Sequence, residues 1–278
     1  MNSTPIVILG FGNLGYHLLK LFWGNGFRNI SIVSNQPLFG EVITGHNNID
    51  NAEFKYEFSI KLGEDIPVYP RSNLTDSSYV FSDEAIVFLC INDDQIGNSL
   101  KELENFDSQL VILSGGYQFI DGIIPPKVSV VYPLYSFVKK INVDWNVVPI
   151  FVESPSQSVV EILHDLHLEK VTYLKSDQRN LLHVAAVFAN NFTNAIFMAA
   201  QEVLRSSPEL KMEFLLPIIQ QTIDKLKFNN ALDIQTGPAK RGDFQTIKRH
   251  EHLLNDLALE QKLYLAVTDY IRIKLNLI

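Results

Sequence analysis

The stretch Ile6-Val7-Ile8-Leu9-Gly10-Phe11-Gly12-Asn13-Leu14-Gly15 decides the fold. An apolar run of strand length passes into a Gly-x-Gly-x-x-Gly pattern, and apolar residues at helical spacing follow it. In such a unit Gly10 allows a tight turn, Gly12 lets the main chain approach phosphates, and Gly15 lets the helix pack against the strand. The unpaired N–H groups at the helix start then face an anion. The stretch predicts a binding loop for the pyrophosphate of a dinucleotide; a purely structural turn is the alternative.

The second strand indicates which dinucleotide is bound. Residues 30–33, apolar except for Ser31, lie at the distance expected for the second strand of a βαβ unit, and Ser34, Asn35 and Gln36 follow them. An NAD site usually carries Asp or Glu here for the ribose 2′-hydroxyl, whereas NADP sites often carry Arg. Neither is present. Ser34, Asn35 and Gln36 can donate hydrogen bonds to a 2′-phosphate without repelling it, so we predict NADP, with NAD as the alternative.

Composition narrows the class of protein. Lys and Arg number 23 against 31 Asp and Glu, a net charge of −8, which argues against a nucleic-acid partner. The single cysteine, Cys90, excludes an intramolecular disulfide and suits a reducing compartment; it reads as a buried small residue rather than a reactive thiol. We find no basic leader and no uninterrupted apolar run of the roughly 18–20 residues that cross a bilayer. We therefore expect a cytoplasmic protein with no membrane partner.

Further apolar runs predict the rest of a doubly wound sheet. Phe54, Tyr56 and Phe58 alternate like an edge strand, but residues 37–80 suggest no chemistry. Strands are expected at 85–91, 110–113, 128–132, 147–152 and 171–174, and a helix at 156–166.

The ends of two of these strands carry polar or small residues. Asn92 follows the strand at 85–91, and Ser114 and Gly115 follow the strand at 110–113. Ligands of open α/β sheets bind outside the carboxyl ends of the strands. We therefore expect Asn92, Ser114 and Gly115 to line the same crevice as the glycine loop. A helix should start after Asn92, with Asp93 or Asp94 as N-cap.

From Ser176 onward the pattern is helical. We expect a long helix at 178–205, a second one that starts at 206–209 and bends at Pro217, and a last one at 244–273. The predicted fold is therefore an α/β Rossmann-like doubly wound sheet in residues 1–174, the dinucleotide-binding domain, followed by an all-α domain in residues 175–278 for substrate binding and dimerisation. Helices this apolar are hard to cover within about 100 residues, so we expect a homodimer through them.

One helix carries a polar stripe. At 100° per residue, His183, Asn190 and Asn194 fall within about 20° of one line on an otherwise apolar helix. Such groups need partners. They either hydrogen-bond across the helical bundle or face the cofactor crevice, with His183 as proton donor and both Asn orienting a substrate carbonyl or the nicotinamide carboxamide.

A second block, Gln235-Thr236-Gly237-Pro238-Ala239-Lys240-Arg241-Gly242-Asp243, forms a rigid turn before a helix. Asp243 is the natural N-cap of that helix. Arg241 and the neighbouring lysines gather positive charge that either binds an anionic substrate or is a solvated face. His250 lies two turns after Asp243, but no third ligand is evident, so no metal site is predicted.

Taken together, these blocks resemble the family of NADP oxidoreductases that joins a Rossmann-like domain to a helical C-terminal domain of unknown function, distantly similar to pyrroline-5-carboxylate reductase. The resemblance rests on the glycine loop, Tyr132-Pro133-Leu134, the run from His183 to Asn194, and the block from Gln235 to Asp243. It implies NAD(P) binding in the first domain, dimerisation through the helices, and a His183 stripe facing the crevice. Family members tend to carry Arg where Asn35 stands, and many carry His-Thr-Ser-Gly where this chain reads Ile112-Leu113-Ser114-Gly115.

The functional hypothesis is an NAD(P)-dependent oxidoreductase that reduces a small carbonyl or imine. The glycine loop binds the cofactor, His183, Asn190 and Asn194 lie opposite the nicotinamide, and Arg241 anchors an anionic substrate. The alternative is a non-catalytic NADP-binding sensor or scaffold, favoured by the missing His after the strand at 110–113. A deazaflavin-dependent NADP reductase is a third possibility, for which the sequence offers no second cofactor pocket.

Overall fold

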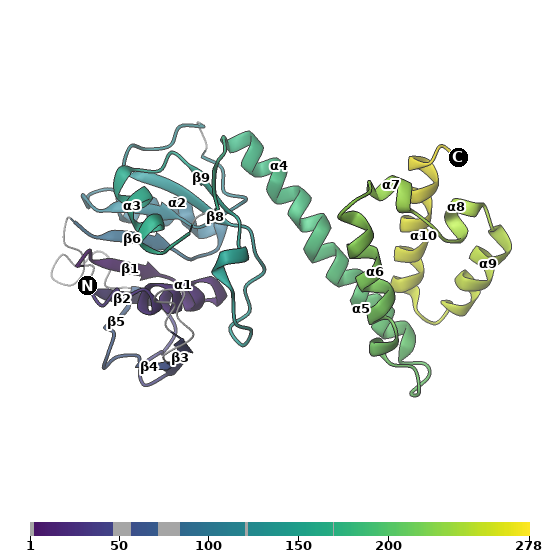
Figure 1. Cartoon of the computed structure of the whole chain (residues 1–278), viewed down its shortest axis with the longest axis horizontal. Coiled ribbons are helices and arrows are strands. Elements are labelled where there is room, and N and C mark those ends of the chain that lie inside the picture. The colour runs from purple at the N-terminus through teal and green to yellow at the C-terminus, as the bar shows by residue number, and fades with distance from the viewer. Residues whose placement is uncertain (1–2, 47–56, 72–83, 120–121, 169) are drawn as a thin grey trace. The chain divides into compact units, whose positions relative to one another are not determined.

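The computed structural model describes residues 3–46, 57–71, 84–119, 122–168 and 170–278. The chain divides into two compact units, residues 1–187, here called the sheet unit, and residues 188–278, here called the helical unit (Figure 1). The first turns of the helix that begins at Ser176 belong to the sheet unit. Each unit is described separately below.

The sheet unit is built on eight strands in the order β10-β9-β8-β7-β6-β1-β2-β5. Neighbouring strands are parallel, except that β8 and β9 are antiparallel. The strands are β1 (Ile6–Leu9), β2 (Ile30–Ser34), β5 (Val68–Pro70), β6 (Ile86–Leu89), β7 (Gln109–Ile112), β8 (Val128–Pro133), β9 (Ile150–Glu153) and β10 (Val171–Tyr173). The predicted Rossmann-like fold followed by helices is confirmed, and the carboxyl ends of β5, β2, β1, β6, β7 and β8 meet at one edge.

A separate antiparallel pair, β3 (Val42–His46) and β4 (Glu57–Lys61), completes the strands of the sheet unit. Phe58 lies in β4, as the alternating pattern predicts for an edge strand. Phe54 and Tyr56, the other members of that pattern, lie outside the described residues.

Helices cover both faces of the sheet, because alternate residues of each buried strand point to opposite sides. Ile6 and Ile8 of β1 pack in one cluster with residues of α1 (Asn13–Gly24) and α3 (Gln157–Asp165). Val7 and Leu9 pack in the other cluster with residues of α2 (Asp93–Glu102). This two-sided burial explains why the strand sequences are continuous apolar runs rather than alternating ones.

The predicted long helix is present but not uniform. It consists of α4 (Ser176–Ala186), a π-helical segment (Val187–Phe192) and α5 (Thr193–Leu204). As one helix, Ser176–Leu204 is long and apolar enough to cross a membrane by length and composition, which the sequence analysis did not anticipate. This is weak evidence for a membrane span, because core helices of soluble proteins pass the same test.

Two helix predictions are wrong. No helix starts at Ser206, whose hydroxyl instead donates to the Val203 carbonyl; α6 (Leu216–Leu226) begins later. Pro217 lies in its first turn, where a missing N–H does no harm, so it causes no kink. The last helix is divided into α9 (Phe244–Leu253) and α10 (Ala258–Lys274), and Gln261 of α10 donates to Glu251 O of α9 across the break. Two short helices, α7 (Ala231–Ile234) and α8 (Pro238–Arg241), precede them.

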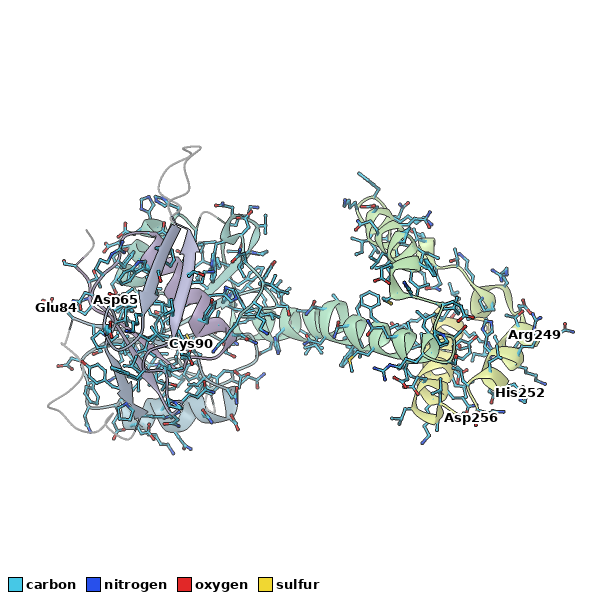
Figure 2. The ribbon with its side chains drawn as sticks, turned by 90° about the horizontal axis from the view of Figure 1, so that it is seen from below. Asp65, Glu84, Cys90, Arg249, His252 and Asp256 are labelled. Atoms are coloured by element: carbon cyan, nitrogen blue, oxygen red, sulfur yellow. The ribbon has the colours of Figure 1, made fainter. Side chains whose placement is uncertain are left out.

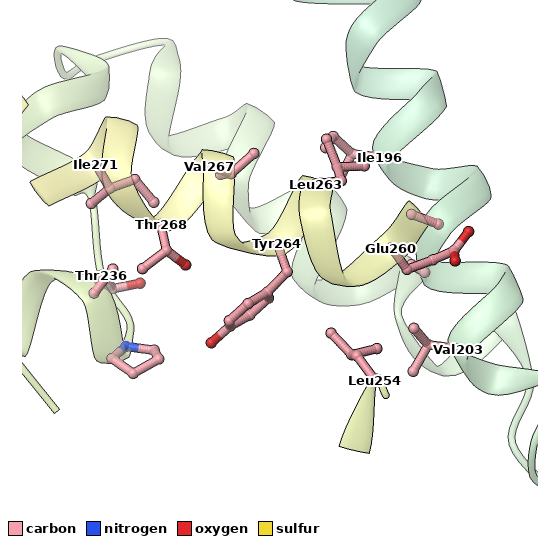
Figure 3. A pocket seen from close by; sticks show the side chains of 14 residues that line it. Ile196, Val203, Thr236, Leu254, Glu260, Leu263, Tyr264, Val267, Thr268 and Ile271 are labelled. Carbon is pink, nitrogen blue, oxygen red and sulfur yellow. The ribbon is translucent and has the colours of Figure 1, made fainter. Parts of the chain in front are cut away.

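The helical unit buries little of its own apolar surface. Its buried residues are Ala239, Ile247, Leu254 and Thr268, whereas large apolar side chains of α5, α6 and α10 stay exposed. An apolar cavity of about 310 Å³ lies between α5, α8 and α10 (Figure 3). Tyr264 of α10 lines this cavity. The unit as a single copy therefore lacks a closed core.

Candidate functional site

The glycine loop between β1 and α1 has the geometry of a phosphate cradle. Gly10 has a φ of +95°, which favours glycine, and a Cβ there would collide with the Cys90 carbonyl. A Cβ on Gly15 would collide with the Gly10 carbonyl, so α1 can lie this close to β1 only without a side chain. At Gly12 a Cβ would meet no atom within 4 Å, so the space beside that residue is open.

The start of α1 offers free N–H groups to that space. Gly12 is the N-cap residue, no side chain among the described residues caps this end, and the first turn holds no acidic residue. Asn13 lies in this turn, and its Oδ1 accepts the main-chain N–H of Lys139 at 3.3 Å. Unpaired donors at the positive end of a helix dipole favour an anion. The residues present therefore fit the pyrophosphate of a dinucleotide.

A cavity of about 230 Å³ lies at the carboxyl ends of β1, β2 and β6. Seven predicted cofactor residues line it: Gly10, Phe11, Gly12, Ser34, Asn35, Gln36 and Asn92. The other five, Asn13, Leu14, Gly15, Ser114 and Gly115, are not among its lining residues, so the expectation that Ser114 and Gly115 share this crevice is not met. Its wall also contains Arg71 from the end of β5, which the sequence analysis did not identify. Ser34 is buried, and its Oγ accepts the Gln36 N–H at 3.0 Å, which fixes the turn after β2.

The loop after β7 is held by a hydrogen-bond network around Ser114. The Ser114 hydroxyl donates to Asp93 Oδ1 at 2.6 Å and accepts the N–H groups of Gly116 and Tyr117 at 3.1 and 2.9 Å. The N-cap of α2 is Asn92 rather than Asp93 or Asp94, so that prediction is wrong. The Asp93 carboxylate receives Ser114 instead of capping the helix.

His183 lies against this loop and pairs with Tyr132. The Tyr132 Oη and His183 Nδ1 atoms are 3.3 Å apart, and the two rings meet edge to face. A Cβ on Gly115 would lie 2.7 Å from His183 Nδ1 and 2.6 Å from Tyr132 Cζ, so the pair packs directly on a residue that must be glycine. Burial raises the pKa of the Tyr132 hydroxyl, and the nearby charge of Arg179 partly offsets this rise.

Arg179 fixes the helix that carries His183. Its side chain is 1% exposed and donates to Glu153 Oε2 at 2.8 Å, to Gly115 O at 2.8 Å and to Tyr117 O at 2.7 Å. Arg179 lies one turn before His183 on α4, on the same face. The sequence analysis missed this residue, although an arginine four positions before a candidate histidine is a visible signal.

The remaining predicted catalytic residues lie in the helical unit. Asn190 belongs to the π-helical segment, Asn194 to α5 and Arg241 to α8, and all three are exposed. The 100° spacing that aligned them with His183 holds only for an α-helix, so the stripe does not continue with that geometry. π-Helical segments occur frequently at functional sites. Their catalytic roles stay predictions.

Other candidate residues have structural partners. Asp243 caps α9 by accepting the Thr246 N–H at 3.0 Å, as predicted, and His250 Nδ1 pairs with Tyr264 Oη at 2.9 Å. Within the described ranges, no three His, Cys, Asp or Glu residues gather as a metal site. Arg249 lies on the outside of the helical unit, and Cys90 follows β6 in the sheet unit (Figure 2). Burial raises the pKa of the Cys90 thiol, as expected of a structural cysteine.

Comparison with known proteins confirms the resemblance. Residues 148–271 match the family described as Domain of unknown function (DUF2520). A "putative NADP oxidoreductase" from Bacteroides fragilis is 26% identical and has a TM-score of 0.76, with 97% of this chain and 98% of that chain covered. No curated protein matches the chain.

Two more distant solved structures share the fold alone. A reductive aminase from Aspergillus terreus in complex with NADPH and ethyl levulinate has a TM-score of 0.61 and is 12% identical. An imine reductase from the same fungus has a TM-score of 0.57 and is also 12% identical. For both, 98% of this chain and 93% of that chain are covered. The chain thus has the fold of NADP oxidoreductases.

Proposed function

We propose that this protein is an NADPH-dependent reductase of a small carbonyl or imine. The observation that carries the proposal is the shared sheet edge: the glycine loop and the Ser114 loop follow the carboxyl ends of β1 and β7, and Tyr132, near the carboxyl end of β8, pairs with His183 of α4. Ligands of open α/β sheets bind at this edge, near the point where the strand order reverses on either side of β1. The names of the structural relatives support the same class of reaction.

The bound cofactor would supply the hydride, and the protein must supply the proton. The Tyr132 hydroxyl lies 3.3 Å from His183 Nδ1 and so holds that side of the ring, which leaves Nε2 for proton transfer. Histidine is the residue type most often used for such proton transfer. Arg179 holds the main chain beneath the pair by donating to the Gly115 carbonyl. His183 therefore acts as the proton donor in its imidazolium form: the Nε2 proton goes to the substrate, the ring becomes neutral, and Tyr132 holds the Nδ1 side of the ring.

The test compares turnover with cofactor binding. His183→Gln should lower the rate of NADPH oxidation across a panel of carbonyls and imines by about 100-fold or more, because general acids contribute 10²–10⁴-fold. The dissociation constant for NADPH should stay within about 2-fold, since His183 does not line the nucleotide cavity. His164→Gln is the matched control, because the side chain of that histidine on α3 is 90% exposed.

The outcome also separates the rival function. Wild-type turnover in His183→Gln would remove His183 from the reaction. Wild-type protein that binds NADPH but oxidises it with no member of the panel would favour the non-catalytic sensor, which Ile112 and Leu113 in place of His-Thr also favour. In the reductase, Asn190 and Asn194 would orient the substrate, and Arg241 would bind its anionic group.

We further propose that the protein is a homodimer through its C-terminal helices. Phe188, Phe214 and Ile218 are 63%, 65% and 61% exposed in the single chain, and the helical unit has few buried residues of its own. Apolar surface on this scale indicates a protein partner. Light scattering should give twice the mass of one chain. Ile218→Glu should lower it to one chain, whereas Gln221→Glu on the same helix should not; a wild-type monomer would contradict the proposal.

A further inference from the structure

In the described part of the chain, the cavity at the carboxyl ends of β1, β2 and β6 is lined by one charged residue, which follows β5. Among the described residues that line the cavity, Arg71 alone is charged. In the register of the sheet Ser34 lies opposite Pro70, so Arg71 leaves β5 beside the point where Asn35 leaves β2. The end of β2 is where Rossmann-type sites distinguish a ribose 2′-hydroxyl from a 2′-phosphate. Arg71 therefore reaches this subsite from the neighbouring strand.

The guanidinium of Arg71 is held in place by three side chains of α2, one of which is the partly exposed carboxylate of Glu102. Its Nη2 donates to Ser99 Oγ at 2.6 Å, and its Nη1 lies 3.5 Å from Gln95 Oε1. Glu102 Oε2 forms an ion pair with Nη2 at 3.5 Å, and the Glu102 side chain is 40% exposed, so solvent weakens this pair. An arginine has five N–H donors, so this arrangement leaves donors for a ligand.

The partners of Arg71 on α2 also orient it before any ligand binds. Ser99 is fully buried, and its hydroxyl donates to the Gln95 carbonyl. The lone pairs of the Ser99 oxygen are therefore left to accept a hydrogen bond from the Arg71 guanidinium. The Arg71 side chain is only 20% exposed. An arginine ordered in advance loses less conformational entropy when it binds an anion.

The same cavity lacks the group that an unphosphorylated ribose requires. No carboxylate is among its described lining residues, so nothing there accepts the 2′-hydroxyl as Asp or Glu does in NAD sites. The Ser34 hydroxyl accepts the Gln36 N–H and shapes the turn. A single cation among neutral donors is suited to a doubly charged phosphate, which an arginine can bind through two N–H groups.

We propose that Arg71 binds the ribose 2′-phosphate and makes the protein select NADP over NAD. This role rests on the proposed function, because it assumes that the cavity holds the adenosine half of the cofactor. Arg71, which follows β5, then supplies the positive charge that NADP sites often carry at the position of Asn35. Ser34, Asn35 and Gln36 then serve as neutral donors on the opposite wall of the same subsite.

The proposal is tested with two fragments that differ only in the phosphate. Isothermal titration should measure the dissociation constants of adenosine 2′,5′-bisphosphate and of 5′-AMP. Wild-type protein should bind the bisphosphate at least about 10-fold more tightly, and Arg71→Gln should weaken it by about 10- to 100-fold while changing 5′-AMP by less than about 2-fold. Arg71→Lys should fall between them, because it keeps charge but loses the two-pronged geometry.

The control is Arg28→Gln, which removes an exposed arginine of the sheet unit that stacks on Trp23 and does not line the cavity. It should bind both fragments as the wild type does. Thermal unfolding of each variant verifies that it is folded. Unchanged bisphosphate affinity in Arg71→Gln, with NADPH still bound by the wild type, would overturn the role of Arg71 alone. Wild-type protein that binds neither fragment nor NADPH would overturn the proposed function as well.

Discussion

Removing Arg179 should destabilise the sheet unit more than any surface change. Arg179→Met would leave the Glu153 carboxylate, which is 8% exposed, without its cation, and would take one donor each from Gly115 O and Tyr117 O. Breaking a buried ion pair from one side costs about 3–5 kcal/mol. Each lost hydrogen bond contributes about 1 kcal/mol. Because these contributions overlap, we expect the free energy of unfolding to fall by about 3–6 kcal/mol.

Urea denaturation followed by tryptophan fluorescence measures this loss, because both tryptophans, Trp23 and Trp145, lie in the sheet unit. Lys61→Met is the control: it breaks an exposed ion pair, with side chains 47% and 56% exposed, and should change stability by at most about 1 kcal/mol. The double variant Arg179→Met, Glu153→Met should recover much of the loss, because replacing both members of a buried pair with apolar residues is often neutral. A loss below about 1 kcal/mol in Arg179→Met would refute this account of how α4 is fixed.

Two further predictions concern packing and pH. Gly115→Ala should reduce NADPH oxidation at least about 10-fold and stability by about 1–3 kcal/mol, because the new Cβ meets His183 and Tyr132. The control is Gly97→Ala, whose Cβ would touch only Tyr117 Oη at 3.7 Å; it should leave the oxidation rate unchanged and stability unchanged or slightly higher. Equal effects of the two substitutions would contradict the packing of His183 and Tyr132 on Gly115. Because the Cys90 pKa is raised in the folded protein, the unfolded thiol loses its proton first, so stability should fall as pH rises above the ordinary value of 9.0. Cys90→Ala should lessen this fall in urea midpoints measured from about pH 7 to pH 10.5, and parallel pH profiles would rule the thiol out.

The parts of the fold that the sequence predicted are those encoded locally. Strands β1, β6 and β7 are largely continuous apolar runs. The turn after β1 is predicted by its three glycines, whose spacing is typical of a dinucleotide-binding loop. Helix boundaries in the C-terminal region were less predictable. Pro217 is compatible with both a kink and a first turn, and no Gly or Pro marks the break before α10, which Gln261 spans by a hydrogen bond to Glu251 O.

The site was predicted where it follows a strand and missed where it depends on pairing between distant segments. Ser34 ends β2, Asn35 follows it, and Asn92 lies three residues after the end of β6, so their place in the cavity could be read from the strands that precede them. Arg71 reaches the same cavity only because β5 pairs with β2, and no local pattern predicts that neighbour. Tyr132 likewise meets His183 across 51 residues of sequence. Such contacts are set by sheet order, which a single sequence does not encode locally.

The most direct test of the account is thermal unfolding with NADPH, NADH or no nucleotide, in the wild type and in Gly12→Asp. A Cβ at Gly12 meets no atom, so this variant should fold normally while placing a carboxylate in the phosphate cradle. NADPH at 100 times its dissociation constant should stabilise the wild type by about 2.7 kcal/mol, NADH at the same concentration should do so less, and Gly12→Asp should respond to neither. A wild-type protein whose unfolding temperature is unchanged by both nucleotides would contradict the central claim that this sheet edge binds a dinucleotide.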